Sequence, residues 1–193
     1  MKLLITGALG HIGSRFIHSL KPGEYDEVVL MDNLSTQRYA SLFNLPNETT
    51  FKFLSNDICN DDLEGPFSEV DVVIHLAAIT DAAGSFKNQE EVERVNYQGT
   101  ERVARACIAS GCKLVFLSTT SVYGVQDGEV DEDCSIDQLK PQSPYADSKL
   151  KSEFLLREMG EREGLDFVIC RFGTIFGVSP GMRFHTAVNK FCW

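Results

Sequence analysis

The sequence predicts an α/β fold built on a doubly wound parallel sheet with helices on both faces. Short runs rich in Val, Ile, Leu and Phe recur along the chain. Most of them are apolar at nearly every position, which is typical of strands that helices cover on both sides. Longer amphipathic segments separate the runs, and this alternation predicts βαβ units with right-handed crossovers.

The elements follow from these patterns in chain order. The predicted strands are residues 2–6, 27–32, 51–57, 70–77, 113–118 and 166–172. The predicted helices are residues 11–20, 90–110 and 145–163, and residues 182–193 predict the opening of a further helix. In the second helix, apolar residues recur at helical spacing and indicate one buried face. Residues 125–140 are rich in Asp and Glu, which predicts a solvated surface loop.

Composition excludes several classes of function. The chain has 193 residues, 43% hydrophobic and 24% charged, which suits one domain with a sizeable core. A net charge of −10 argues against a nucleic-acid partner, which requires a basic face. The six cysteines form no C-x-x-C pair, so we expect free thiols. No histidine lies at ligand spacing from a cysteine, so we expect no metal site. Without a membrane-length apolar run or a signal peptide, we expect a cytoplasmic protein with no membrane partner.

A glycine-rich stretch, TGALGHIG at residues 6–13, follows the first predicted strand and opens the first helix. Gly7, Gly10 and Gly13 permit a tight turn, close approach of backbone to a phosphate, and packing of the helix on the sheet. The amides near His11 and Ile12, at the helix N-terminus, would bind the pyrophosphate of a dinucleotide. A glycine-rich turn without a ligand is the alternative, but its place at the start of a βαβ unit favours a Rossmann-type site.

Acidic residues end the next two predicted strands. Asp32 stands where a carboxylate binds the ribose hydroxyls of NAD, and it would repel the 2′-phosphate of NADP. No arginine follows until Arg38, so we expect NAD, although Asp32 could instead cap a turn. Asp57 either contacts the adenine or caps a turn. The other cofactor contacts expected around these strand ends are Asn33, Ser35 and Ile58.

A tyrosine and a lysine four positions apart begin the third predicted helix. Tyr145 and Lys149 share one helix face, behind Ser143 and Pro144, which are typical of a helix start. Such pairs are common on helix surfaces, so the spacing alone does not indicate catalysis.

Seven motifs, taken in order, resemble the extended short-chain dehydrogenase/reductase family, in its branch of NAD-dependent sugar-nucleotide epimerases and dehydratases. They are TGALGHIG, DNLS, HLAA (75–78), VNYQGT (95–100), STTSVYG (118–124), YADSK (145–149) and RFGTIFG (171–177). The resemblance runs from residue 1 to about residue 185. It implies a catalytic set of Thr119, Tyr145 and Lys149.

The implied roles agree with simple acid–base chemistry. A phenol has a pKa of about 10, so Tyr145 needs nearby positive charge from Lys149 and the oxidised nicotinamide to act as a base. Lys149 would also bond the nicotinamide ribose, and Thr119 would hold the substrate hydroxyl. The HLAA backbone, at Leu76, Ala77 and Ala78, is expected to line the cofactor, whereas His75 is expected to be a packed structural residue. Asn96 either supports the cofactor site or bonds a nearby carbonyl.

Departures from the family pattern reduce the number of candidate reactions. Thr120 and Ser121 stand where 4,6-dehydratases carry Asp and Glu, which disfavours dehydration. The remaining reading is a nucleotide-sugar 4-epimerase that oxidises C4 and returns the hydride. The alternatives are a keto-sugar reductase or dehydratase of the same fold, and a non-catalytic NAD-binding module. Thr120 and Thr174 are further candidate substrate residues, and Arg183 either binds the substrate diphosphate or is an ordinary loop residue.

The resemblance also implies a domain division and an oligomer. We expect residues 1–178 to form the NAD-binding domain and residues 179–193 to begin a substrate lobe, most of which lies outside this chain. A homodimer through helices 90–110 and 145–163 is expected from the resemblance alone.

Overall fold

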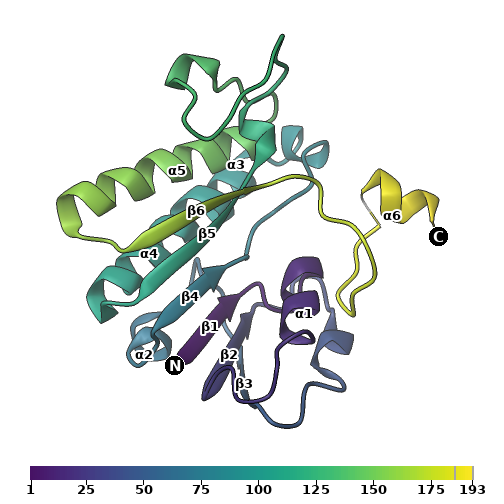
Figure 1. Cartoon of the computed structure of the whole chain (residues 1–193), viewed down its shortest axis with the longest axis vertical. Coiled ribbons are helices and arrows are strands. Elements are labelled where there is room, and N and C mark those ends of the chain that lie inside the picture. Colours follow the sequence, from purple (N-terminus) through teal and green to yellow (C-terminus); the bar gives the residue numbers. More distant parts are fainter. Residues whose placement is uncertain (185, 193) are drawn as a thin grey trace.

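The fold positions a crevice at the middle of a parallel sheet. The computed structural model describes residues 1–184 and 186–192, and within them six parallel strands lie in the order β3-β2-β1-β4-β5-β6 (Figure 1). The strands are β1 (Lys2–Thr6), β2 (Glu27–Asp32), β3 (Thr50–Ser55), β4 (Val72–His75), β5 (Lys113–Thr119) and β6 (Phe167–Phe172). The order reverses between β1 and β4, and in such sheets ligands bind outside the carboxyl ends of the strands at this point. The predicted fold class is confirmed.

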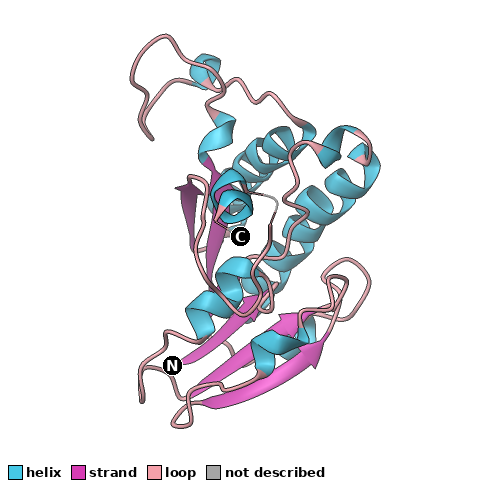
Figure 2. Ribbon diagram, turned by 90° about the vertical axis from the view of Figure 1, so that its right-hand side faces the viewer, coloured by secondary structure: helices cyan, strands magenta, loops and turns pink. Residues whose placement is uncertain are grey.

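Helices cover both faces of the sheet, as the perpendicular view in Figure 2 shows. They are α1 (His11–Ile17), α2 (Glu64–Phe67), α3 (Gln89–Val92), α4 (Gly99–Ser110), α5 (Pro144–Glu163) and α6 (Ala187–Phe191). A π-helical segment, η3 (Glu93–Gln98), joins α3 to α4, and short 3₁₀ turns lie at Tyr39–Leu42, Gly84–Phe86, Thr120–Val122 and Ile136–Gln138. The acidic loop 125–140 projects away from the sheet at the top of Figure 1.

The apolar strands fill two cores because successive side chains point to opposite faces. Leu3 and Ile5 pack with Ile17 of α1 on one face. Leu4, between them in sequence, packs on the other face in the cluster that contains Leu156 of α5. All five side chains are at most 1% exposed. Burial of one such side chain contributes about 1.5–3 kcal/mol, which explains why these strands are apolar at every position.

The start of α5 is the best-defined helix end near the crevice. The Ser143 hydroxyl accepts the N–H of Ala146 (3.2 Å), and Pro144 occupies the first helical position. The helix ends at Gly164, whose φ of +77° suits glycine. The serine, the proline and the glycine together fix where Tyr145 and Lys149 stand.

Several predicted boundaries differ from the structure. The first helix ends at Ile17 rather than at residue 20, because the N–H and hydroxyl of Ser19 turn back to the Phe16 carbonyl (2.9 and 2.7 Å). The strands predicted at 51–57 and 70–77 are Thr50–Ser55 and Val72–His75. Helix 90–110 is interrupted by η3, and the helix predicted to open within 182–193 spans Ala187–Phe191. His185 and Trp193 lie outside the described residues.

Candidate active site

A cavity of about 620 Å³ opens at the carboxyl ends of the central strands. The loop after β1, the segment after β4, the ends of β5 and β6, and the start of α5 form its walls. Predicted site residues among those lining it are Gly7, Gly10, His11, Ile12, Gly13, Leu76, Ala78, Thr119, Thr120, Tyr145, Lys149, Thr174 and Arg183. The fold thus brings the glycine loop and the candidate catalytic residues into one space.

The glycine loop packs so closely on its neighbours that side chains do not fit. Gly7 has a φ of +65°, and a Cβ placed there would lie 2.6 Å from the backbone nitrogen of Ala77. A Cβ at Gly13 would lie 2.5 Å from the carbonyl oxygen of Ala8. The turn is closed by the N–H of Gly10, which donates to the Gly7 carbonyl (3.0 Å). These contacts explain the glycine spacing and leave backbone amides at the start of α1 beside the cavity.

The carboxylate of Asp32 supports this loop from the end of β2. It accepts the N–H of Leu9 (3.1 Å) and the N–H of Leu34 (2.9 Å). Asp32 does not line the cavity itself, and neither do the predicted contacts Asn33 and Ser35. Turn capping by Asp32, the alternative read from the sequence, is therefore present in the structure.

Asp57 caps the turn that follows β3. Its carboxylate accepts the N–H of Cys59 (2.7 Å) and the side-chain amides of Asn33 and Asn60 (3.3 Å each). Burial would raise the pKa of Asp57, but these donors outweigh it and the pKa is lowered. The neighbouring Ile58 is buried in the core, and neither residue lines the cavity.

Asn96 holds the segment that follows β4. Its side-chain oxygen accepts the N–H of Ile79 (2.8 Å), and its amide donates to the Ile79 carbonyl (3.0 Å) and to the Ser148 hydroxyl (3.1 Å). The residue sits in the π-helical segment, a feature often found near functional sites. Asn96 and Ala77 do not line the cavity, so Asn96 acts on its wall and on the residue next to Lys149.

His75 is a core residue, as expected. It is fully buried and its two ring nitrogens pair with the hydroxyls of Thr6 (2.7 Å) and Thr100 (3.0 Å). Burial, with a smaller contribution from the charge of Lys149, lowers the pKa of His75 to about 3. The imidazole is therefore neutral at physiological pH and links β1, β4 and α4.

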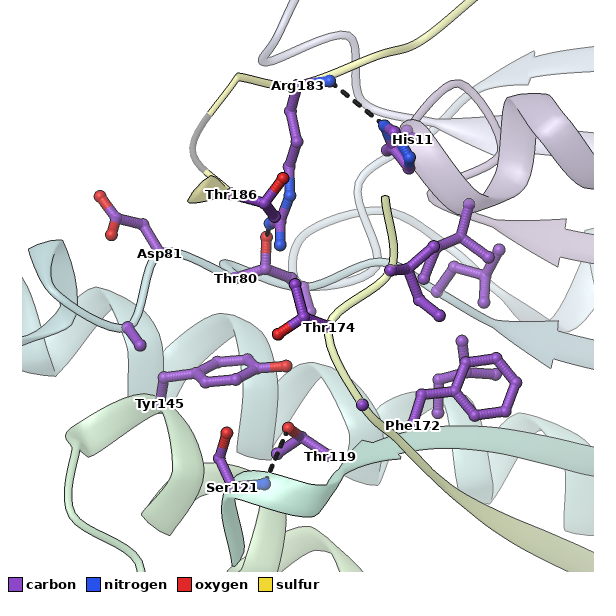
Figure 3. A pocket seen from close by; sticks show the side chains of 18 of the residues that line it. His11, Thr80, Asp81, Thr119, Ser121, Tyr145, Phe172, Thr174, Arg183 and Thr186 are labelled. Atoms are coloured by element: carbon purple, nitrogen blue, oxygen red, sulfur yellow. Dashed lines mark hydrogen bonds between the residues drawn. The ribbon is translucent and has the colours of Figure 1, made fainter. Parts of the chain in front are cut away.

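Thr119, Tyr145 and Lys149 meet at one end of the cavity. Thr119 ends β5, and its hydroxyl accepts the N–H of Ser121 (3.1 Å). Figure 3 shows the Tyr145 ring reaching into the pocket, with its hydroxyl on the same side as Thr119 and Thr174. Lys149 is 3% exposed and its ammonium lies 4.5 Å from the centroid of the Phe116 ring. A substrate hydroxyl can thus meet the phenol and the threonine together.

Burial controls the pKa values of this group. It raises the pKa of Tyr145, and the charge of Arg183 and the hydroxyl of Thr119 oppose it only in part. This differs from the lowering expected from the sequence, because sequence spacing reveals a neighbouring lysine but not how little water reaches the phenol. Burial also lowers the pKa of Lys149 to about 7, with Glu153 opposing. Lys149 is thus only partly charged at neutral pH.

Arg183 links the C-terminal segment to the glycine loop. Its guanidinium donates to the Thr80 hydroxyl, and its backbone N–H donates to Nδ1 of His11 (3.3 Å), as drawn in Figure 3. Burial, followed by the charges of Arg183 and Arg38, lowers the pKa of His11. Arg183, Arg38 and Lys149 all line the cavity, which is therefore a basic site in an acidic chain.

Comparison with known proteins settles the family. The model of the NAD dependent epimerase/dehydratase family matches residues 3–192. The chain belongs to this family. The resemblance inferred from the sequence motifs is thereby confirmed: the chain is a member of a family of NAD-dependent enzymes.

Three relatives show the range of the family. The uncharacterized UDP-glucose epimerase YtcB of Bacillus subtilis (strain 168) is 34% identical to this chain. The matched region covers 98% of this chain and 62% of that protein. UDP-glucuronic acid 4-epimerase from Bacillus cereus, whose crystal structure contains UDP-glucuronic acid and NAD, is 33% identical in sequence with a TM-score of 0.85. The matched region covers 100% of this chain and 63% of that one. The dTDP-D-glucose 4,6-dehydratase of Mus musculus is 34% identical over 91% of this chain and 51% of its own length. The chain thus spans between about half and two thirds of their lengths.

Sequence reasoning missed several residues of the cavity in this family member. Arg38, Thr80, Asp81 and Thr186 line it, and none was predicted as a site residue. Arg38 was noted only as too distant in sequence to matter. It lies close to the loop, since its Nη1 would be 3.9 Å from a Cβ at Gly10. Position just after the HLAA motif could have indicated Thr80 and Asp81, whereas no local signal marks Arg38 or Thr186.

The described residues contain neither a metal-binding cluster nor a membrane-spanning helix. Among residues 1–184 and 186–192, no group of three or more His, Cys, Asp or Glu side chains is arranged to hold a metal ion. Within the same residues, no helix has both the length and the apolar character needed to cross a membrane.

Proposed function

We propose that the chain is the NAD-binding part of a nucleotide-sugar 4-epimerase. One observation carries the proposal: a single cavity is lined by the glycine loop and by Thr119, Tyr145 and Lys149. A phosphate-binding loop and an acid–base group that share one space suit hydride transfer between a dinucleotide and a sugar hydroxyl.

The residues present fit NAD. The contacts of Gly7 and Gly13 leave room for backbone but not for side chains at the start of α1, where a pyrophosphate would accept N–H bonds. Asp32 does not line the cavity, but it ends β2 beside the glycine loop, where its carboxylate would accept the ribose hydroxyls and would disfavour a 2′-phosphate. NAD held by these residues would supply the hydride acceptor, and then the hydride donor, for C4 of the sugar.

The chain's own residues handle the proton. Tyr145 takes the proton of the C4 hydroxyl as the hydride leaves and gives it back at the end of the cycle. Thr119 orients that hydroxyl, and Lys149 bonds the ribose and favours the phenolate by its charge. Burial raises the pKa of Tyr145, so positive charge at Lys149 and Arg183 is needed to bring the phenol within reach of physiological pH.

Epimerisation is favoured over dehydration because no second acid–base pair lies among the described residues that line the cavity. Elimination of water from the sugar needs a carboxylic acid and a base beside the tyrosine, but Thr120 and Ser121 occupy that turn. Asp81 is the one carboxylate among the described residues that line the cavity, and it accepts the N–H of Gly84 (3.0 Å). In an epimerase, the keto-sugar instead rotates and takes the hydride back on its other face.

The proposed substrate is a sugar joined to a nucleoside diphosphate. In Figure 3, Thr174 lies beside the Tyr145 hydroxyl and Arg183 lies beyond it, so a sugar hydroxyl would reach Thr174 and an anionic diphosphate would reach Arg183. Structural neighbours crystallised with UDP-glucuronic acid or UDP-glucose support this class. A homodimer through α4 and α5 remains part of the proposal, and sedimentation of the protein would test it.

Two measurements test the function. We expect the chain to bind NADH, followed by fluorescence, more tightly than NADPH. In the full-length protein, Tyr145→Phe should abolish turnover of the nucleotide sugar while NADH affinity stays within about twofold, because only the proton-transferring hydroxyl is lost. Unchanged turnover would refute the catalytic assignment, and the binding of neither cofactor would refute the dinucleotide site.

A further inference from the structure

A buried ion pair stands directly behind the proposed catalytic residues. Glu153 lies one helical turn beyond Lys149 on α5, and its side chain is 1% exposed. Arg171 of β6, 8% exposed, donates to it as a fork, with Nη2 2.6 Å from Oε2 and Nε 3.1 Å from both carboxylate oxygens. The proposed reaction assigns no role to either residue.

Hydrogen bonds connect this pair to both ends of the turn that follows β5. The Ser118 hydroxyl, just before Thr119, donates to the Glu153 carboxylate. The Arg171 guanidinium donates to the hydroxyl of Tyr123 (3.0 Å) and stacks 4.9 Å from the centroid of its ring. The segment that carries Thr119 is therefore attached at residues 118 and 123 to one buried carboxylate and its partner.

The same carboxylate is the negative charge that acts on Lys149. Among the described residues, the Lys149 ammonium has no hydrogen-bond acceptor and contacts the Phe116 ring. The charged groups around it are few: Glu153 raises its pKa, and His75 of β4 is neutral. Tyr145 shares its helix face, and the charge of Arg183 acts on Tyr145.

Stability alone does not account for the pair. Desolvation of two buried charges offsets most of their attraction, and apolar residues of similar volume often stabilise a fold equally well. A positional role does account for it, because one carboxylate bonds the strand that ends in Thr119 and lies one helical turn from Lys149.

We propose that Glu153 is a positioning residue, whose carboxylate holds the end of β5 that carries Thr119 and places a negative charge one helical turn behind Lys149. Arg171 is the counterion that compensates the desolvation of this buried carboxylate. The inference rests on the proposed function, in which Lys149 and Thr119 act on cofactor and substrate.

The direct test is Glu153→Gln, with Arg171→Lys as its matched control. The midpoint of the Lys149 titration is measured by NMR of lysine labelled with ¹³C at Cε, in the chain without substrate. The signal of Lys149 is assigned by its absence in Lys149→Met. Glu153→Gln should lower this midpoint by about one pH unit or more, because the negative charge is lost while the shape stays. Arg171→Lys keeps the carboxylate, so it should reduce stability and leave the midpoint in place.

Turnover by the full-length protein gives the second readout. Glu153→Gln should lose activity about tenfold near pH 8 and recover most of it near pH 6, where Lys149 is charged again. Should the single variant not fold, Glu153→Gln combined with Arg171→Met removes both buried charges and should show the same shift.

The outcomes separate two failures. An unchanged midpoint in a folded glutamine variant, or an equal shift in Arg171→Lys, refutes the role of Glu153. A lowered midpoint with an unaltered pH profile of turnover refutes instead the proposed role of Lys149.

Discussion

Replacing Lys149 with methionine should stabilise the fold while it removes function. The side chain is 3% exposed, and burial lowers its pKa from the ordinary 10.5 to about 7. In the unfolded chain the lysine stays protonated up to about pH 10.5, so the unfolded state binds more protons than the folded state between these two values. The free energy of unfolding must therefore rise with pH across this window.

The magnitude follows from the two pKa values. At about 1.4 kcal/mol for each tenfold change in proton affinity, the lowered pKa destabilises the folded chain by about 4 kcal/mol at pH 7. Near pH 9.5 the same cost is about 1 kcal/mol, because the unfolded lysine itself begins to lose its proton. Methionine has nearly the same length and no charge to desolvate, so Lys149→Met removes this cost.

Urea unfolding of the chain and of Lys149→Met, followed at several values between about pH 7 and 9.5, measures the effect. The gain in stability from the substitution should shrink by about 3 kcal/mol across this range. Other groups that titrate here are present in both proteins and cancel in the difference. A gain that does not change with pH would refute the reasoning, because it would mean that packing, and not the cost of a buried ammonium, explains the variant. Loss of NADH binding by the same variant would show the functional reason for retaining a costly lysine.

Three further predictions concern the glycine loop, the core and the cofactor. Gly7→Ala should abolish NADH binding and destabilise the chain, since the added Cβ would lie 2.6 Å from the backbone. Gly23 has an equally left-handed backbone but open space around it, so Gly23→Ala should cost only about 1 kcal/mol of stability and leave binding unchanged. For His75, whose pKa falls to about 3, stability should drop as pH falls below about 6.5, and His75→Gln should flatten this acid limb in urea unfolding. Asp32→Ser should let NADPH bind about as well as NADH in fluorescence titrations, and adding Arg38→Ala should cancel the gain.

The parts of the fold that the sequence predicted are those that depend on neighbours in the chain. Leu3, Leu4 and Ile5 are apolar in succession because one strand feeds two cores, and that pattern is visible without a structure. The start of α5 was readable because Ser143 and Pro144 act on the next few residues. The spacing of Tyr145 and Lys149 belongs to the same kind of local signal.

The missing parts depend on contacts between distant segments and on burial. Arg183 reaches Thr80, 103 positions earlier in the chain, and no local pattern marks such a pair. The bulge at η3 exists because Asn96 turns to the Ile79 backbone, so the interrupted helix could not be read from apolar spacing. The pKa of Tyr145 moves opposite to the direction expected from its charged neighbours, because the structure adds desolvation that a sequence does not display.

Charge ties these observations together. A chain with a net charge of −10 repels anions at long range, yet its cavity is lined by Arg38, Lys149 and Arg183 against the single carboxylate of Asp81 among the described lining residues. A low-dielectric cavity strengthens the local field, so the cavity would attract the phosphates of the proposed dinucleotide. The same low dielectric lowers the pKa of Lys149 to about 7, and the buried carboxylate of Glu153 opposes this lowering only in part. In the proposed function, the carboxylate of Glu153 therefore counteracts the cost of burial at Lys149, and Arg171 is the buried counterion of that carboxylate.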